Sequence, residues 1–291
     1  MSETQDLPRW DLTNVYPGLD SAEFERAKQN LEQLTADLEG YLAEHGINPA
    51  VDPKDWPPQA LADVLGGVIE RLIAAQDLMW TIRSYLNSFI STDSFNEKAK
   101  KQQSLLEPLF VKLDQLETVT FKGWIGKHAR QAKAAVALNP RVSEHAFYLK
   151  DLVEQSKYMM SPAEEELAGE LFLSGATAWN KLQGNVTSQL SWEIEDEDGT
   201  LKKLPMTAII NLRGHASETM RRRGYEAELA AWKAVEVPLA AAMNGVKGSQ
   251  NTVFKRRGRQ DAVEKSLDQS KIDRETLEAM LAAVKGSLPV F

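Results

Sequence analysis

Apolar residues recur at intervals of three and four along most of this sequence, and this spacing constrains the fold more than any other feature. One run extends from Phe24 to Tyr41, and a longer run extends from Leu61 to Phe89. Side chains three and four residues apart lie on one face of a helix, so each run predicts an amphipathic helix with a buried side. The sequence therefore predicts a mainly α fold, in a chain of 291 residues that is long enough for two domains.

The first part of the chain contains two further helical patterns. A third helix is expected to bury the stripe Leu105, Leu109, Leu113 and Leu116. A fourth helix is expected over residues 121–138, because Asn139-Pro140 is a typical stop signal. We therefore predict an N-terminal helical domain over residues 1–140 and a second region over residues 141–291.

The second region begins with clear capping signals. Ser161 is a typical N-cap, Pro162 suits the first helical position, and Glu164 completes the pattern of a capping box. Gly175 predicts a break between this helix and the next one. A long helix is expected over residues 217–243.

The exception to the helical spacing is the segment LSWEIEDEDGTLKKLPMTAII at residues 190–210, which predicts one β-hairpin. A two-residue turn at Asp198-Gly199 would place Ile194 opposite Lys203. A three-residue loop at Asp198–Thr200 places Ile194 opposite Leu204, and we favour it because the apolar side chains of both strands then share one face. A lone hairpin is marginal in water, so it is expected to pack on helices or on strands from elsewhere.

The composition excludes several classes of function. The 34 basic and 42 acidic residues give a net charge of -8, which disfavours general attraction to nucleic acid or anionic lipid. The absence of cysteine excludes disulfides, thiolate nucleophiles and cysteine-ligated zinc. The N-terminus lacks the features of a secretory signal, and Glu70 and Arg71 interrupt the most apolar segment, so no membrane span is predicted. These features predict a soluble, cytoplasmic protein.

The sequence also lacks the motifs of known catalytic centres. Common zinc hydrolases carry H-E-x-x-H on a helix, where two imidazoles one turn apart bind the metal and the glutamate activates water. The four histidines are His45, His128, His145 and His215, and none has another histidine four residues away. We interpret them as surface or capping residues, and we predict no catalytic, cofactor-binding or metal-binding residue in this chain. The G-x-S-x-G and G-x-G-x-x-G motifs are absent as well.

Three clusters of charge are candidates for functional groups. Arg221–Arg223, and Lys255–Arg257 with Arg259, are basic enough to suggest a nucleic-acid contact, but a binding domain would combine them with aromatic platforms. Glutamates near the first cluster indicate ion pairing on a helix face instead. The carboxylates Glu164–Glu166 lie in a first helical turn, where negative charge complements the helix dipole. We therefore predict no nucleic-acid partner and no acid–base pair.

Several segments, taken together, resemble the oligoendopeptidase F family. The opening PRWDLTNVYPGLDSAEFERA is similar to the start of these proteins, especially at Trp10–Leu12 and Tyr16-Pro17. The similarity continues through the capped helix at Glu164-Glu165, through Gly175 and Trp179, and then through the hairpin into the late helices. It covers essentially the whole chain in the expected order. Members of this family are zinc metallopeptidases of the thimet-oligopeptidase clan.

The resemblance implies a thimet-oligopeptidase-like fold, mostly helical, with a deep channel through which short peptides reach a zinc ion. In this family the H-E-x-x-H helix and a third glutamate ligand lie well C-terminal of the matching segments, whereas this sequence ends at AVKGSLPVF. We therefore expect the catalytic zinc domain to lie beyond residue 291. The chain alone is expected to bind no catalytic zinc and to be inactive. Oligopeptide substrates and the C-terminal catalytic region are its expected partners, and the hairpin is expected to pair with downstream strands or with a peptide.

A different interpretation is a self-contained, non-catalytic helical protein that binds peptides or acts as a scaffold. Cooperative unfolding of a monodisperse monomer would favour the scaffold. Exposed apolar surface would favour the first interpretation, because an interface without its partner leaves an apolar patch.

Overall fold

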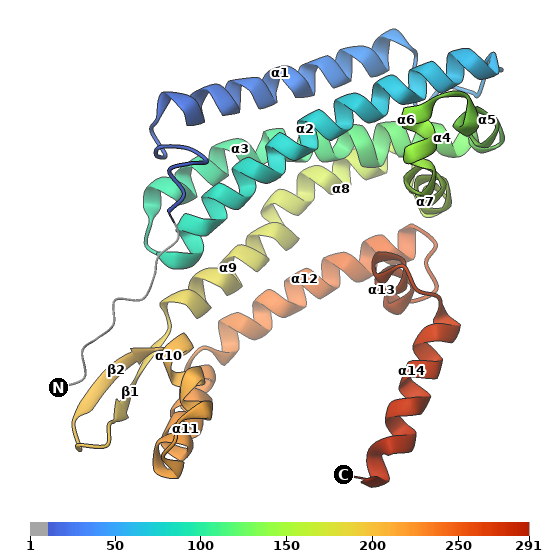
Figure 1. Ribbon diagram of the computed structural model, residues 1–291. Coiled ribbons are helices and arrows are strands. Elements are labelled where there is room, and N and C mark those ends of the chain that lie inside the picture. Colours follow the sequence, from blue (N-terminus) through green and yellow to red (C-terminus); the bar gives the residue numbers. More distant parts are fainter. Residues whose placement is uncertain (1–10, 291) are drawn as a thin grey trace. The chain divides into compact units, whose positions relative to one another are not determined.

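The computed structural model describes residues 11–290, so Trp10 of the N-terminal resemblance lies outside the described residues. The fold is mainly α with one antiparallel hairpin, as the sequence predicts (Figure 1). The chain divides into two compact units, Met1–Lys157 and Tyr158–Phe291. The sequence placed this division between residues 140 and 141. It lies later because Leu149 and Leu152 are buried in the core of the first unit, which keeps their helix there.

The described part of the first unit is built from helices that share one apolar core. Its elements are α1 (Ala22–Glu44), α2 (Pro58–Thr92), α3 (Glu97–Gln115), the π-helical segment η1 (Leu116–Phe121), α4 (Lys122–Lys127), α5 (Ala129–Ala135), the 3-10 turn η2 (Val136–Leu138), α6 (Pro140–Glu144) and α7 (Ala146–Ser156). The first three helices lie side by side in Figure 1 and contact one another. Phe24 and Leu38 of α1 and Leu65 and Met79 of α2 are buried, which confirms the two long apolar runs.

The buried face of α3 differs from the prediction. Of the predicted stripe, Leu113 and Leu116 are buried and Leu109 packs against the core, but Leu105 is 64% exposed. Leu106 and Phe110 are buried in addition. The two stripes lie next to each other on the same helix. Because both have helical spacing, the spacing alone does not decide which of them faces the neighbouring helices.

Two helices that were expected to be continuous are broken. Residues 121–138 form α4, α5 and η2, with the first break at His128, where φ is -105° and ψ is 17°. Residues 217–243 form α11 and the first part of α12, with a break at Val235. Pro238 explains the second break, because a proline inside a helix lacks an N–H and its ring clashes with the carbonyl four residues earlier.

The second unit has a much smaller core. Its elements are α8 (Pro162–Ser174), α9 (Ala176–Gln189), β1 (Ser191–Glu195), β2 (Leu201–Pro205), α10 (Met206–Asn211), the 3-10 turn η3 (Leu212–Gly214), α11 (Glu218–Ala234), α12 (Glu236–Arg256), α13 (Ala262–Ser270), α14 (Arg274–Ser287) and the 3-10 turn η4 (Leu288–Val290). The predicted capping box at Ser161 and Glu164 is present, and Gly175 separates α8 from α9 as predicted.

The hairpin pairs Trp192 with Leu204 and Ile194 with Lys202, so both registers considered from the sequence are wrong. The loop does contain three residues, but they are residues 197–199, because the Asp196 N–H donates to the Thr200 carbonyl at 2.8 Å. Glycine occupies the left-handed position at the end of this loop, with φ of +79°. The observed register differs from the favoured one by two residues, so every side chain keeps its expected face.

The apolar face of the hairpin packs on helices. Ile194 of β1 is buried with Met206 and Ile209 of α10 and with Ala227 and Ala231 of α11. Within the described residues the sheet has two strands, so each strand has one unpaired edge. The helices thus supply the support that a lone hairpin needs.

None of the helices between residues 11 and 290 combines the length and the apolar character that crossing a membrane requires.

Candidate functional site

Each histidine has a local role that differs from metal binding. Three of them follow directly after helices, namely His45 after α1, His145 after α6 and His215 after η3. His128 is the exception to the surface interpretation, because its side chain is buried and stacks on Trp124 with ring centroids 4.4 Å apart. Among residues 11–290, no group of three His, Cys, Asp or Glu side chains is placed to hold a metal ion. These residues therefore do not fit the zinc ion that the resemblance implies.

The carboxylate cluster at the start of α8 and the second basic cluster pair with each other. Arg257 donates to Glu165 through two nitrogens, with the Nε–Oε1 bond at 2.9 Å, and the Glu165 side chain is only 4% exposed. Next to this pair, Arg256 donates to Glu164 at 3.0 Å on an exposed surface. Arg259 is buried over the ring of Tyr158 and pairs with Asp268. The charges thus join the N-terminal end of α8 to the C-terminal end of α12.

The arginines of the first basic cluster also bind nearby groups of the same unit. Arg223 donates to the Glu195 and Asp196 carbonyls at the end of β1, and its guanidinium pairs with the Glu195 carboxylate at 2.9 Å. Arg221 donates to the carbonyls of residues 215 and 216, which precede α11. Both arginines therefore hold the hairpin and the start of α11 in place.

A polar network in the first unit has perturbed acid–base properties. The Tyr148 hydroxyl donates to Glu117 Oε1 at 2.7 Å, and the Gln76 amide donates to Glu117 Oε2 at 2.6 Å. Burial raises the pKa of the Glu117 carboxyl, although both hydrogen bonds lower it. Burial also raises the pKa of Tyr148. Because the network joins α2, η1 and α7, we assign it a structural role.

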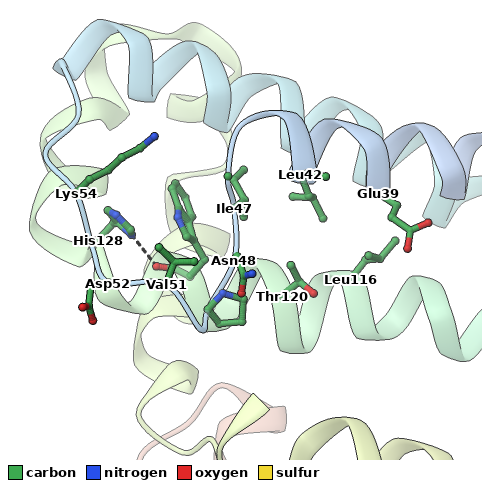
Figure 2. Close-up of a pocket in the computed structure, with 14 residues that line it drawn as sticks. Glu39, Leu42, Ile47, Asn48, Val51, Asp52, Lys54, Leu116, Thr120 and His128 are labelled. Atoms are coloured by element: carbon green, nitrogen blue, oxygen red, sulfur yellow. Dashed lines mark hydrogen bonds between the residues drawn. The ribbon is translucent and has the colours of Figure 1, made fainter. Parts of the chain in front are cut away.

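A cavity of about 590 Å³ lies in the first unit, between the C-terminal end of α1 and the η1–α4 segment (Figure 2). Its floor is a stripe of residues four apart, Leu116, Thr120, Trp124 and His128. Leu42 of α1, and Ile47, Val51, Asp52 and Lys54 of the loop that follows it, form the opposite wall. A volume of this size falls within the range of about 300–1,000 Å³ that is typical of small-molecule sites. The sequence did not indicate this site, because its residues come from segments about 80 residues apart with no shared motif.

Comparisons with known proteins give one consistent result. A family model described as Oligopeptidase F matches residues 128–192, which extend from the end of α4 into β1. The solved structure of oligoendopeptidase-F from Enterococcus faecium is similar, with a TM-score of 0.71 and 17% sequence identity, over 92% of this chain and 49% of that chain. A candidate peptidase from Chlamydophila abortus has a TM-score of 0.53 and 14% identity, over 96% of this chain and 44% of that chain. Among curated proteins, none matches the sequence.

The chain therefore spans about half the length of the two solved proteins whose fold it shares. At these identities the structural likeness establishes the fold, and the family-model match adds a link in sequence. Both agree with the resemblance seen in the sequence. Residues 128–192 thus resemble the oligoendopeptidase F family in sequence, and the chain shares the fold of part of one such enzyme.

Proposed function

We propose that this chain is the N-terminal region of a zinc-dependent oligoendopeptidase that hydrolyses short peptides. The observation that carries the proposal is the fold shared with oligoendopeptidase-F over 92% of this chain, and the family match at residues 128–192 supports it. In this proposal the helices form one wall of a channel that admits oligopeptides. In the same proposal the zinc ligands lie outside this chain, which covers 49% of the Enterococcus faecium protein.

The surface of the second unit supports a role within a larger protein. The apolar face of α14 and η4 is uncovered, with exposed fractions of 56% for Met280, 47% for Leu281, 58% for Val284 and 59% for Leu288. Contiguous apolar patches are uncommon on the surface of a monomeric protein, and where they occur they often mark an interaction surface. We interpret this stripe as a surface that another part of the enzyme covers, which disfavours the self-contained scaffold.

Peptide hydrolysis by two proteins tests the proposal. The chain 1–291 and the product of the complete reading frame are each incubated with zinc and a library of internally quenched peptides, with and without a chelator. We expect hydrolysis by the complete product that stops with chelator, and no hydrolysis by the chain alone.

Chelator-sensitive hydrolysis by the chain 1–291 would show that the catalytic residues lie within it, contrary to the proposal. A complete product that is folded, loaded with zinc and inactive on every peptide would contradict the assigned activity.

A further inference from the structure

The apolar stripe on α14 and η4 has the spacing of a coiled coil. Leu277, Leu281, Val284 and Leu288 follow one another at intervals of four, three and four residues, which places them on one side of the helix. Leu288 is the C-cap residue and keeps a helical conformation, with φ of -53° and ψ of -37°. Leu277 is partly exposed and the other three side chains are exposed. Two helices pair through a seam of this kind, with apolar side chains at the a and d positions of each heptad.

The rest of the second unit leaves this helix uncovered. None of the residues 274–287, all of which the structure describes, is buried. In Figure 1, α14 (red) extends from α13 and lies apart from α11 and α12. An isolated helix shorter than about 12–15 residues is marginal in water. Since α14 has 14 residues, a second helix on its stripe would stabilise it.

Two opposite charges flank the stripe on the same side. Glu278 and Lys285 are exposed, occupy equivalent positions one heptad apart, and make no ion pair among the described residues. In an antiparallel pair of identical helices, Glu278 of one copy therefore lies beside Lys285 of the other. In a parallel pair, Glu278 would lie beside Asp273, which has the same charge, and Lys285 beside the uncharged Met280. The charges of α14 are thus complementary to a second α14 that runs in the opposite direction.

We propose that this stripe pairs with the same stripe of a second copy of the chain, as an antiparallel helix pair. Leu281 packs against Val284 of the second copy, Leu277 packs against Leu288 of the second copy, and two symmetric ion pairs form between Glu278 and Lys285. Because both copies use the same surface, the contact closes at a dimer. The inference rests on the proposed function in one respect: another part of the complete enzyme covers the stripe, so a second copy occupies it only in the chain 1–291.

Sedimentation equilibrium of the chain 1–291 tests the pairing. A contact between two short helices is small beside the about 1,200–2,000 Å² of a stable interface, so we expect a dissociation constant of about 0.1 mM. Between concentrations of about 10 µM and about 1 mM, the average mass should rise from 32.5 kDa toward twice that value. A mass that stays at 32.5 kDa throughout would overturn the proposal, and so would growth beyond a dimer.

Charge reversals distinguish this pairing from unspecific adhesion of the apolar stripe. Glu278→Lys or Lys285→Glu alone places like charges beside each other and should weaken pairing at least tenfold. An equimolar mixture of these two variants should restore pairing, because each lysine then lies beside a glutamate of the other variant. The double variant Glu278→Lys with Lys285→Glu should restore it as well.

Glu275→Lys is the matched control, because it makes the same change of charge on the opposite side of α14. It should leave the dissociation constant unchanged. Equal dissociation constants in Glu278→Lys and Glu275→Lys, or a mixture that pairs no better than its components, would refute the antiparallel arrangement. All of these positions are exposed, so the substitutions leave the core of the unit intact.

Amide hydrogen exchange gives a second measurement on the same samples. Exchange in α14 should slow at the higher concentration, whereas exchange in α1 should not change, and equal exchange in α14 at both concentrations would contradict the pairing. Failure of this inference is distinct from failure of the proposed function, which would appear as an inactive complete product rather than as a monomeric chain 1–291.

Discussion

The adjacent arginines at the end of α12 allow a controlled test of how burial sets the strength of an ion pair. Arg257 pairs with a carboxylate that is 4% exposed, whereas Arg256 pairs with Glu164, whose side chain is 45% exposed. The two pairs join the same two helices and involve neighbouring residues. We expect Arg257→Ala to destabilise the contact between α8 and α12 strongly and Arg256→Ala to have little effect.

The expected magnitudes follow from burial. Removing one partner of a fully buried pair costs about 3–5 kcal/mol, because the remaining charge is left without compensation. The Arg257 side chain is itself 26% exposed, so water will partly solvate the site after substitution, and we expect about 2–3 kcal/mol. An exposed pair contributes about 0–1 kcal/mol, which is the expectation for Arg256→Ala. At about 1.4 kcal/mol per factor of ten, Arg257→Ala should raise the population of the opened α8–α12 contact roughly 30- to 150-fold.

Amide hydrogen exchange measured by mass spectrometry is the appropriate assay, because it reports on α8 and α12 separately from the first unit. Exchange in α1 and α2 serves as the internal control and should remain unchanged in both variants. In the double variant Glu165→Gln with Arg257→Ala, the uncompensated charge is removed, so exchange in α8 should be slower than in Arg257→Ala alone. The reasoning is refuted if the two arginine variants accelerate exchange equally. It is also refuted if the free energy of opening lost in the double variant equals the sum of the losses in Glu165→Gln and Arg257→Ala measured separately.

Two further predictions concern the other close contacts of the fold. Burial raises the pKa of the Glu117 carboxyl above its ordinary value of 4.5, so the folded chain binds this proton more tightly than the unfolded chain. The stability that this proton contributes is therefore lost as the pH rises through the raised pKa. Glu117→Gln should remove this part of the pH dependence of the unfolding free energy. Unfolding free energies from urea titrations that change equally with pH in both proteins between pH 4 and 7 would contradict the prediction. A Cβ on Gly245 of α12 would lie 2.4 Å from Trp179 Cδ1 of α9, so Gly245→Ala should destabilise the chain by about 1–3 kcal/mol. Gly248→Ala, where nothing lies within 4 Å, should be stabilising by about 0.5–1 kcal/mol, and thermal melts that shift both variants in the same direction would exclude this explanation.

The sequence determined the features that depend on neighbouring residues. Ser161 and Glu164 form the predicted capping box, and Gly175 ends α8, because these contacts involve residues within one helical turn. The face of each hairpin residue was also determined, since alternation along a strand fixes it. The register was not, because it depends on where the loop closes, and the Asp-Gly pair allowed a loop that begins one residue earlier than expected.

The tertiary structure alone decided which of these local surfaces meet. The clusters at Glu164-Glu165 and Arg256-Arg257 are 92 residues apart and appeared in the sequence as two unrelated groups of charge. His128 was expected at the surface, yet packing against Trp124 and the loop after α1 buries it beside a cavity. Helical spacing is a property of a few consecutive residues, whereas the partner of each face is selected by the packing of the whole unit. For that reason the composition and periodicity specified the helices, and only their assembly created the ion pairs and the cavity.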